Sequence, residues 1–80
     1  MISHTEYINR LNELIKLHKD AVANEMAVSA NRSPKAEVDA AMEIVRDTFM
    51  AVTSMMAEKV DPATKRKVAM NEDYFFIFVD

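Results

Sequence analysis

Three carboxylates recur at intervals of four residues in the middle of the sequence, at Asp39, Glu43 and Asp47. In a helix this spacing places them on one acidic ridge. Carboxylates bind hard divalent cations, but such cations take ligands from several directions, and a single ridge offers only one. We therefore interpret the acidic ridge as a solvated helix face, eased by Arg46, or as a docking stripe for a basic partner.

Positive charge gathers in a basic cluster that spans nine residues: Lys59, Lys65, Arg66 and Lys67. A cluster of this kind can contact the phosphates of a nucleic acid, and such binding weakens steeply with salt. No aromatic residue is interleaved with it, and acidic residues follow closely. We interpret it as a solvated turn and keep a nucleic-acid-associated regulator as the alternative function.

The residue types that support catalysis and metal binding are scarce. The sequence contains no cysteine, no glycine and two histidines. Without cysteine there is no disulfide and no thiolate metal site, and two histidines do not complete a zinc site. Without glycine the chain lacks the usual loops that hold phosphates or dinucleotides. We therefore expect no catalytic residues, no metal and no cofactor, and interpret the protein as non-enzymatic.

The elements that position these charges are expected to be helices. Ser3 and Glu6 have the spacing of a capping box, and Thr5 is an alternative cap. The apolar side chains that follow recur with a period of about 3.6. This pattern predicts a first helix over residues 4–29. Its opposite face is polar and is expected to lie in water: Asn9, Asn12, Glu13, Lys16, Lys19 and Asp20.

The sequence NRSP interrupts the first helix at residues 31–34. Ser33 is a favourable N-cap and Pro34 suits the first helical position, so we predict a second helix over residues 34–58. Its apolar residues follow alternating steps of four and three, which form a heptad seam suited to another helix. The seam consists of Val38, Met42, Val45, Phe49, Val52 and Met56.

Asp61 and Pro62 repeat the signals of a helix start, and they predict a short third helix over residues 62–70. Polar residues 71–73 end this helix. The aromatic tail, residues 74–79, then reads YFFIFV and strongly favours β structure. No other segment is expected to form a strand.

Two helices of about 25 residues joined by a short link must fold back on each other as an antiparallel hairpin. The predicted fold class is therefore all-α, in one domain over residues 1–80, with a short third helix and an apolar C-terminal tail. The third helix is too short to cover the open side of the hairpin. We expect a second copy to cover it, which gives a helical bundle.

The aromatic tail has three alternative positions. It can pack on its own hairpin, it can cross to a second subunit or pair with that subunit's tail, or it can dock on a different protein. Left in water it is an aggregation hazard, and the acids Glu72, Asp73 and Asp80 flank it as gatekeepers. All three positions indicate a contact surface rather than chemistry.

We interpret the chain as a small regulator or inhibitor that acts by protein–protein interaction, of a kind that bacteriophages and mobile elements encode. Its expected partners are itself, as a dimer or tetramer, and an unidentified protein. The N-terminus lacks a signal-peptide pattern, and no apolar run reaches the length of about 20 residues that spans a membrane, so we expect a soluble, cytoplasmic protein. The predicted partner-binding residues are the acidic ridge with Met42, Phe49, Met56, Tyr74, Phe75, Phe76 and Phe78.

Overall fold

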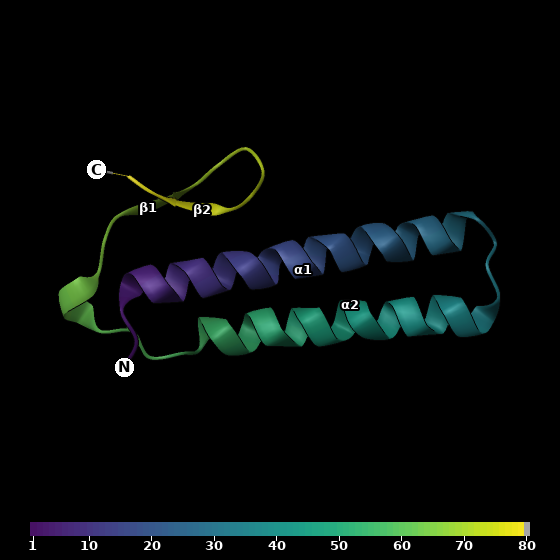
Figure 1. Ribbon diagram of the computed structural model, residues 1–80, viewed down its shortest axis with the longest axis horizontal. Helices are drawn as coiled ribbons and strands as arrows, with labels where there is room; N and C mark the ends of the chain where they lie inside the picture. The colour runs from purple at the N-terminus through teal and green to yellow at the C-terminus, as the bar shows by residue number, and fades with distance from the viewer. Residues whose placement is uncertain (80) are drawn as a thin grey trace.

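The computed structural model describes residues 1–79 and is mostly helical (Figure 1). Two long antiparallel helices pack side by side, and a small two-stranded sheet lies beside the first of them. The predicted helical hairpin is confirmed, whereas the all-α class is wrong in the C-terminal part. The elements are α1 (His4–Ala30), α2 (Lys35–Met56), the 3₁₀ turn η1 (Pro62–Thr64), β1 (Val68–Met70) and β2 (Phe76–Phe78).

The start of α1 follows the predicted cap. Ser3 is extended, and its hydroxyl oxygen accepts a hydrogen bond from the backbone N–H of Glu6 at 3.1 Å. This bond satisfies one of the N–H groups that the first turn of a helix leaves without a partner. The Glu6 carboxylate pairs with Arg10, one turn further along, at 2.6 Å.

The end of α1 has the geometry of a Schellman motif, although the chain has no glycine for it. The N–H of Arg32 donates to the carbonyl of Ser29, and the N–H of Ser33 donates to the carbonyl of Val28, both at 3.3 Å. Arg32 has a φ angle of 53°, in the left-handed region that glycine adopts at no steric cost. The motif therefore carries a backbone cost at Arg32.

The second helix begins one residue later than predicted. Pro34, not Ser33, is the N-cap residue of α2, and no side chain caps this end. The predicted N-cap role of Ser33 is wrong, because the backbone N–H of Ser33 completes the closing turn of α1. At its other end α2 stops at Met56, and Ala57 and Glu58 close it with 3₁₀-type hydrogen bonds.

The predicted third helix over residues 62–70 is wrong. The Asp61 carboxylate caps the N–H of Ala63 at 3.0 Å as expected, but the helical turn ends at Thr64, and Lys65 is already extended. A helix of nine residues is marginal by itself in water. Residues 68–70 form β1 instead and pair antiparallel with β2 of the aromatic tail. The expectation that no other segment forms a strand is therefore wrong too.

A tight loop joins the two strands. The Asn71 side-chain oxygen accepts hydrogen bonds from the backbone N–H groups of Asp73 and Phe75, at 3.0 and 2.9 Å. Tyr74, predicted to start the extended tail, lies in this loop with a φ angle of 65°. The loop fixes the register of the C-terminal hairpin, in which Met70 faces Phe76 and Val68 faces Phe78.

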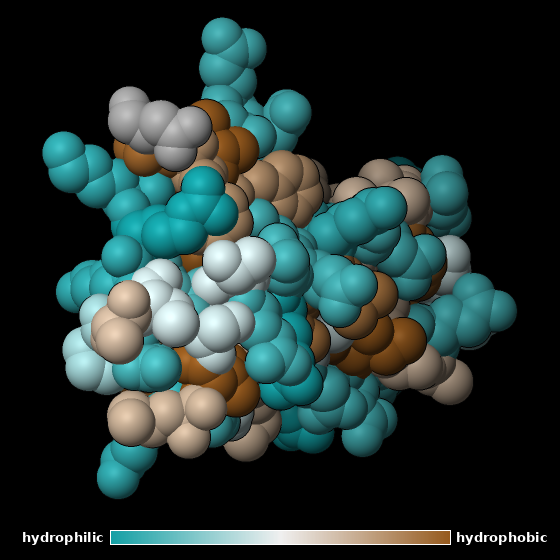
Figure 2. Space-filling model, turned by 60° about the vertical axis from the view of Figure 1, so that its left-hand side comes forward, coloured by the Kyte–Doolittle hydropathy of each residue, from teal (hydrophilic) through white to brown (hydrophobic). Residues whose placement is uncertain are grey.

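The three parts of the protein lie side by side in a single layer. The backbone extends over 50 × 25 × 11 Å. Two stacked helices span roughly 13–15 Å between their outer Cα atoms, since their axes lie about 8–10 Å apart and the Cα radius is about 2.3 Å. Figure 1 looks down this short axis and shows α2, α1 and the C-terminal hairpin next to one another. Both broad faces of the layer are therefore open, and Figure 2 shows apolar patches among the polar side chains at the surface.

The buried core is correspondingly small. Ile8 and Leu11 are buried in the first half of α1, which is flanked by α2 and by the C-terminal hairpin. Ala21 and Ala41 are buried further along, where small side chains let two helices approach closely. Within residues 1–79, neither long helix has an apolar stretch long enough to cross a membrane.

The strain at Arg32 gives a first prediction. The change Arg32→Gly should raise the free energy of unfolding by about 1 kcal/mol. A residue with a Cβ atom costs about 1–2 kcal/mol in the left-handed region. Glycine also gives the unfolded chain more conformational freedom, and this offsets part of the gain. The control, Arg32→Ala, removes the same charge but keeps the Cβ atom, and should give no such gain. Urea unfolding monitored by circular dichroism compares them; equal stabilities would contradict the strain.

Candidate interaction surfaces

The predicted heptad seam of α2 is divided between two environments. Its valines, at positions 38, 45 and 52, are half-buried in the layer. Its larger members, Met42, Phe49 and Met56, remain 50%, 58% and 61% exposed. Because they are spaced by seven residues, these three side chains lie along one side of the helix. We call them the α2 stripe.

One histidine of α1 borders the α2 stripe. The His18 ring lies 5.9 Å from the ring of Phe49, measured between centroids. Its Nδ1 atom is 3.0 Å from the hydroxyl oxygen of Thr48, which is itself 2.9 Å from the carbonyl of Ile44. If the hydroxyl donates to this carbonyl, His18 is the donor to the hydroxyl. His18 is thus held at the edge of the layer, beside the exposed Phe49.

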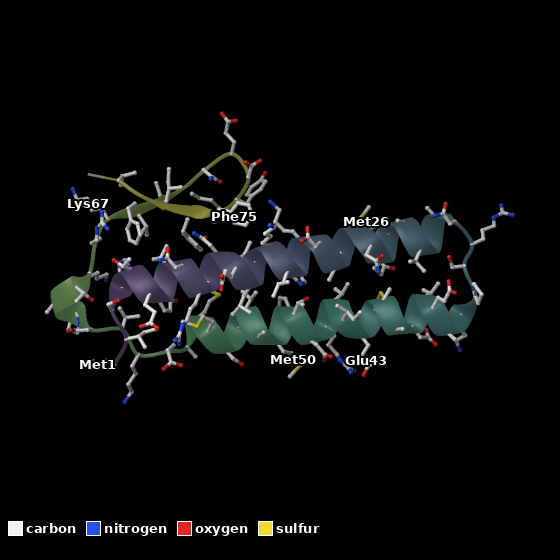
Figure 3. All side chains as sticks on the ribbon, in the orientation of Figure 1. Met1, Met26, Glu43, Met50, Lys67 and Phe75 are labelled. Carbon is white, nitrogen blue, oxygen red and sulfur yellow. The ribbon has the colours of Figure 1, made fainter. Side chains whose placement is uncertain are left out.

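The acidic ridge lies on a different side of α2 from the stripe. Asp39, Glu43 and Asp47 are all exposed, and Figure 3 shows Glu43 pointing away from α1. Arg46 approaches Glu43 at 3.9 Å, with both side chains about two-thirds exposed, so this pair contributes little to stability. Among residues 1–79, no three histidine or acidic side chains come close enough to hold a metal ion.

The basic cluster surrounds the N-terminal end of α1. The backbone N–H of Ile2 donates to the carbonyl of Lys59 at 3.3 Å. After the 3₁₀ turn, the chain passes His4 at residues 65–67 in an extended conformation. The backbone N–H of Arg66 donates to the Nδ1 atom of His4 at 2.9 Å, and its guanidinium lies 4.1 Å from the ring centre of Phe78. The cluster therefore does not form a continuous helical surface, and Arg66 helps to hold the C-terminal hairpin. Lys65 and Lys67 are exposed.

The aromatic tail takes the first of its three alternative positions, against its own helical hairpin. Phe75, Phe76 and Phe78 are half-buried, and Figure 3 shows Phe75 between the C-terminal hairpin and α1. Tyr74 remains exposed in the loop. Three of the four aromatics of the tail, all predicted to bind a partner, are thus half-buried within the chain.

Asn12 holds the edge of β2 in a way that the sequence pattern did not predict. Its Nδ2 atom donates to the carbonyl of Phe76 at 2.8 Å, and its Oδ1 atom accepts from the N–H of the same residue at 2.9 Å. The side-chain amide therefore takes the place of a neighbouring strand and satisfies both backbone groups. Asn12 was expected to lie on a solvated helix face.

Two further residues of α1 anchor the C-terminal hairpin on the same side of the helix. The Lys19 ammonium donates to the carbonyl of Asp73 and lies 4.5 Å from the ring centre of Phe75. His4 is buried, and its ring lies 6.1 Å from the ring of Phe78, measured between centroids. His4, Asn12 and Lys19 recur at about every second turn of α1. This spacing of polar residues beside the apolar stripe was the only signal in the sequence.

Comparison with known proteins gives no relative. The chain matches no protein-family model, and no similar curated protein or solved structure was found.

The two hydrogen bonds of Asn12 give a second prediction. The change Asn12→Ala should lower the stability of the C-terminal hairpin by about 1–3 kcal/mol, because it leaves the backbone groups of Phe76 without partners. The matched control is Asn9→Ala, which alters the same residue type at an exposed position of the same helix. Amide hydrogen exchange should show faster opening of β1 and β2 in the first variant alone. Equal exchange in both variants would contradict the role of Asn12.

Proposed function

We propose that this protein is a non-enzymatic regulator that acts by binding proteins, and that it works as a self-associated helical bundle. The observation that carries the proposal is the α2 stripe: three large apolar side chains, each at least half exposed, on a molecule one layer thick. A second copy of the same chain is the proposed occupant of this stripe.

The need for a second layer follows from the small core. A stable domain normally has two layers of secondary structure packed around shared apolar side chains. A chain of 80 residues buries a modest share of its surface, and this one has no cysteine for disulfides. Oligomerisation is a common way for small proteins to gain the missing stability. Covering the α2 stripe supplies that gain.

The stripe also fits a copy of itself. Met42 and Met56 are each seven residues from Phe49, so two antiparallel copies of α2 centred on Phe49 place Met42 opposite Met56 of the partner. A twofold interface requires this kind of self-complementary surface.

The acidic ridge stays outside such a bundle. Glu43 points away from α1, and all three carboxylates are exposed. Asp39 and Glu43 border Met42 at one end of the stripe, and pairing of the stripes is expected to leave the ridge available to a basic partner protein. Regulation would then mean that the assembled bundle occupies a basic surface on that partner. Steep salt dependence of partner binding is expected, because exposed charges are screened over about 10 Å at 0.1 M salt.

Two neighbouring residues of equal exposure provide a third prediction. Phe49 is 58% exposed and Met50 is 59% exposed, but Met50 lies off the stripe. Figure 3 shows Met50 pointing away from α1. The change Phe49→Glu should lower the mass of the assembly, because it places two carboxylates at the centre of the apolar interface. The change Met50→Glu should leave the mass unaltered.

Size exclusion with light scattering measures the masses, and circular dichroism checks that both variants remain helical. If the two variants have the same mass while both stay folded, the stripe is not the contact between copies. If only Phe49→Glu has a lower mass, the stripe is a contact between copies, and the outer surface is the place to look for the partner protein.

A further inference from the structure

The outer edge of β1 has backbone groups that no other part of the described chain satisfies. Within the C-terminal hairpin, the N–H of Val79 donates to the carbonyl of Lys67 at 3.1 Å, and the N–H of Asn71 donates to the carbonyl of Phe75 at 2.9 Å. In an antiparallel ladder, hydrogen-bonded pairs alternate with pairs that are not hydrogen-bonded. The backbone groups of Ala69 therefore bond to β2, whereas those of Val68 and Met70 point outward from the sheet.

The two edges of this small sheet differ at one position, because one of the two outward residues of β2 has a partner on α1. On β2, the outward groups of Phe76 are satisfied by Asn12. On β1, the outward groups belong to Val68 and Met70, and no hydrogen bond to residues 1–79 joins them. Met70 is also half exposed. An open strand edge of this kind is a template for pairing with another strand.

The charges that flank β1 are arranged symmetrically about Ala69. Lys65 and Asp73 are each four residues from Ala69, and Arg66 and Glu72 are each three residues from it. Basic residues precede the strand and acidic residues follow it. An antiparallel partner with the same sequence therefore brings each basic group toward an acidic one, and like charges stay apart.

We propose that the edge of β1 is a self-association site, at which β1 of a second copy pairs antiparallel about a twofold axis at Ala69. This contact is separate from the α2 stripe and does not depend on it. The proposal adds a second contact between copies and joins two small sheets into one sheet of four strands.

The direction of the backbone groups agrees with this register. Pairing about Ala69 places Val68 opposite Met70 of the partner, and both residues carry outward N–H and carbonyl groups. Each such pair exchanges two hydrogen bonds, as hydrogen-bonded antiparallel pairs do. The hydrogen-bond pattern therefore requires no rearrangement of the C-terminal hairpin.

Neighbouring registers match the charges less well. An axis at Val68 keeps the hydrogen-bond direction but places Lys65 opposite Asn71 and brings no ion pair together. An axis at Met70 pairs Lys67 with Asp73 alone. The axis at Ala69 places Lys65 opposite Asp73 and pairs Val68 with Met70 twice. The axes at Val68 and Met70 each pair one outward residue with itself only, because the N–H of Arg66 is bonded to His4 and residue 72 lies in the loop. Charge and backbone pairing therefore favour the register about Ala69.

The contact is short, and this determines how it can be observed. The N–H of Arg66 is already bonded to His4, and the acids at positions 72 and 73 lie in the loop, so the ladder is limited to Val68 and Met70. A contact of this size depends on protein concentration by mass action. Its most direct signature is the exchange rate of the Val68 and Met70 amide hydrogens.

The experiment measures amide exchange by NMR on the full chain across a dilution series. From the lowest to the highest concentration, exchange at Val68 and Met70 should slow several-fold. The Ile77 amide, which lies in a hydrogen-bonded pair inside the C-terminal hairpin, is the internal control and should change much less. Exchange at Val68 and Met70 that does not vary with concentration would overturn the proposal.

Charge reversal then tests the partner and the register. Lys65→Glu and Asp73→Lys each place like charges opposite each other in a pair of identical chains, so each variant alone should lose the protection at Val68 and Met70. In an equimolar mixture the two variants attract each other at both ends, so protection should return. A mixture that behaves like the separate variants would contradict pairing about Ala69.

The same readout separates this contact from the α2 stripe. The change Phe49→Glu should reduce the mass of the bundle but leave the concentration-dependent protection of Val68 and Met70 in place. If that variant loses both, the edge is not an independent contact and the proposal as stated is wrong. If the edge amides never become protected while Phe49→Glu still alters the mass, the proposed function stands without it.

Discussion

The structure depends on one constraint: its elements lie side by side in a single layer. In this arrangement α1 has neighbours along two edges, with α2 on one and the C-terminal hairpin on the other. It therefore contributes most of the buried residues, including Ile8 and Leu11. By contrast, α2 has a neighbour along one edge only. Its large apolar side chains consequently remain at the surface, so only part of its apolar face is buried within one chain.

The C-terminal hairpin widens this layer without covering either broad face. Polar groups on α1 hold it, chiefly the Asn12 amide on β2 and the buried His4 beside Arg66. These contacts account for the apolar tail without a partner protein, because Phe76 and Phe78 are half-buried on α1. The surfaces left for association are then the α2 stripe and the edge of β1, and both are compatible with twofold pairing.

The helices were predictable from local signals, and the C-terminal hairpin was not. The capping box at Ser3 and the apolar period placed α1 to within one residue of its end, because these patterns act over one or two turns. Strand β1 depends on a partner several residues away, and its own sequence also suits a helix, so only the pairing with β2 decides its state. Asn12 was missed for a similar reason: its backbone partner, Phe76, is 64 residues away along the chain.

The central claim is that this layer needs a second copy to be stable. The most direct measurement is the thermal unfolding midpoint of the unaltered protein over a range of protein concentrations. Circular dichroism at 222 nm, where helices give a strong negative signal, monitors the unfolding. If copies bind the folded chain only, the midpoint should rise steadily with concentration. A fully helical protein whose midpoint is the same at every concentration would show that a single layer is stable alone, and would contradict the account.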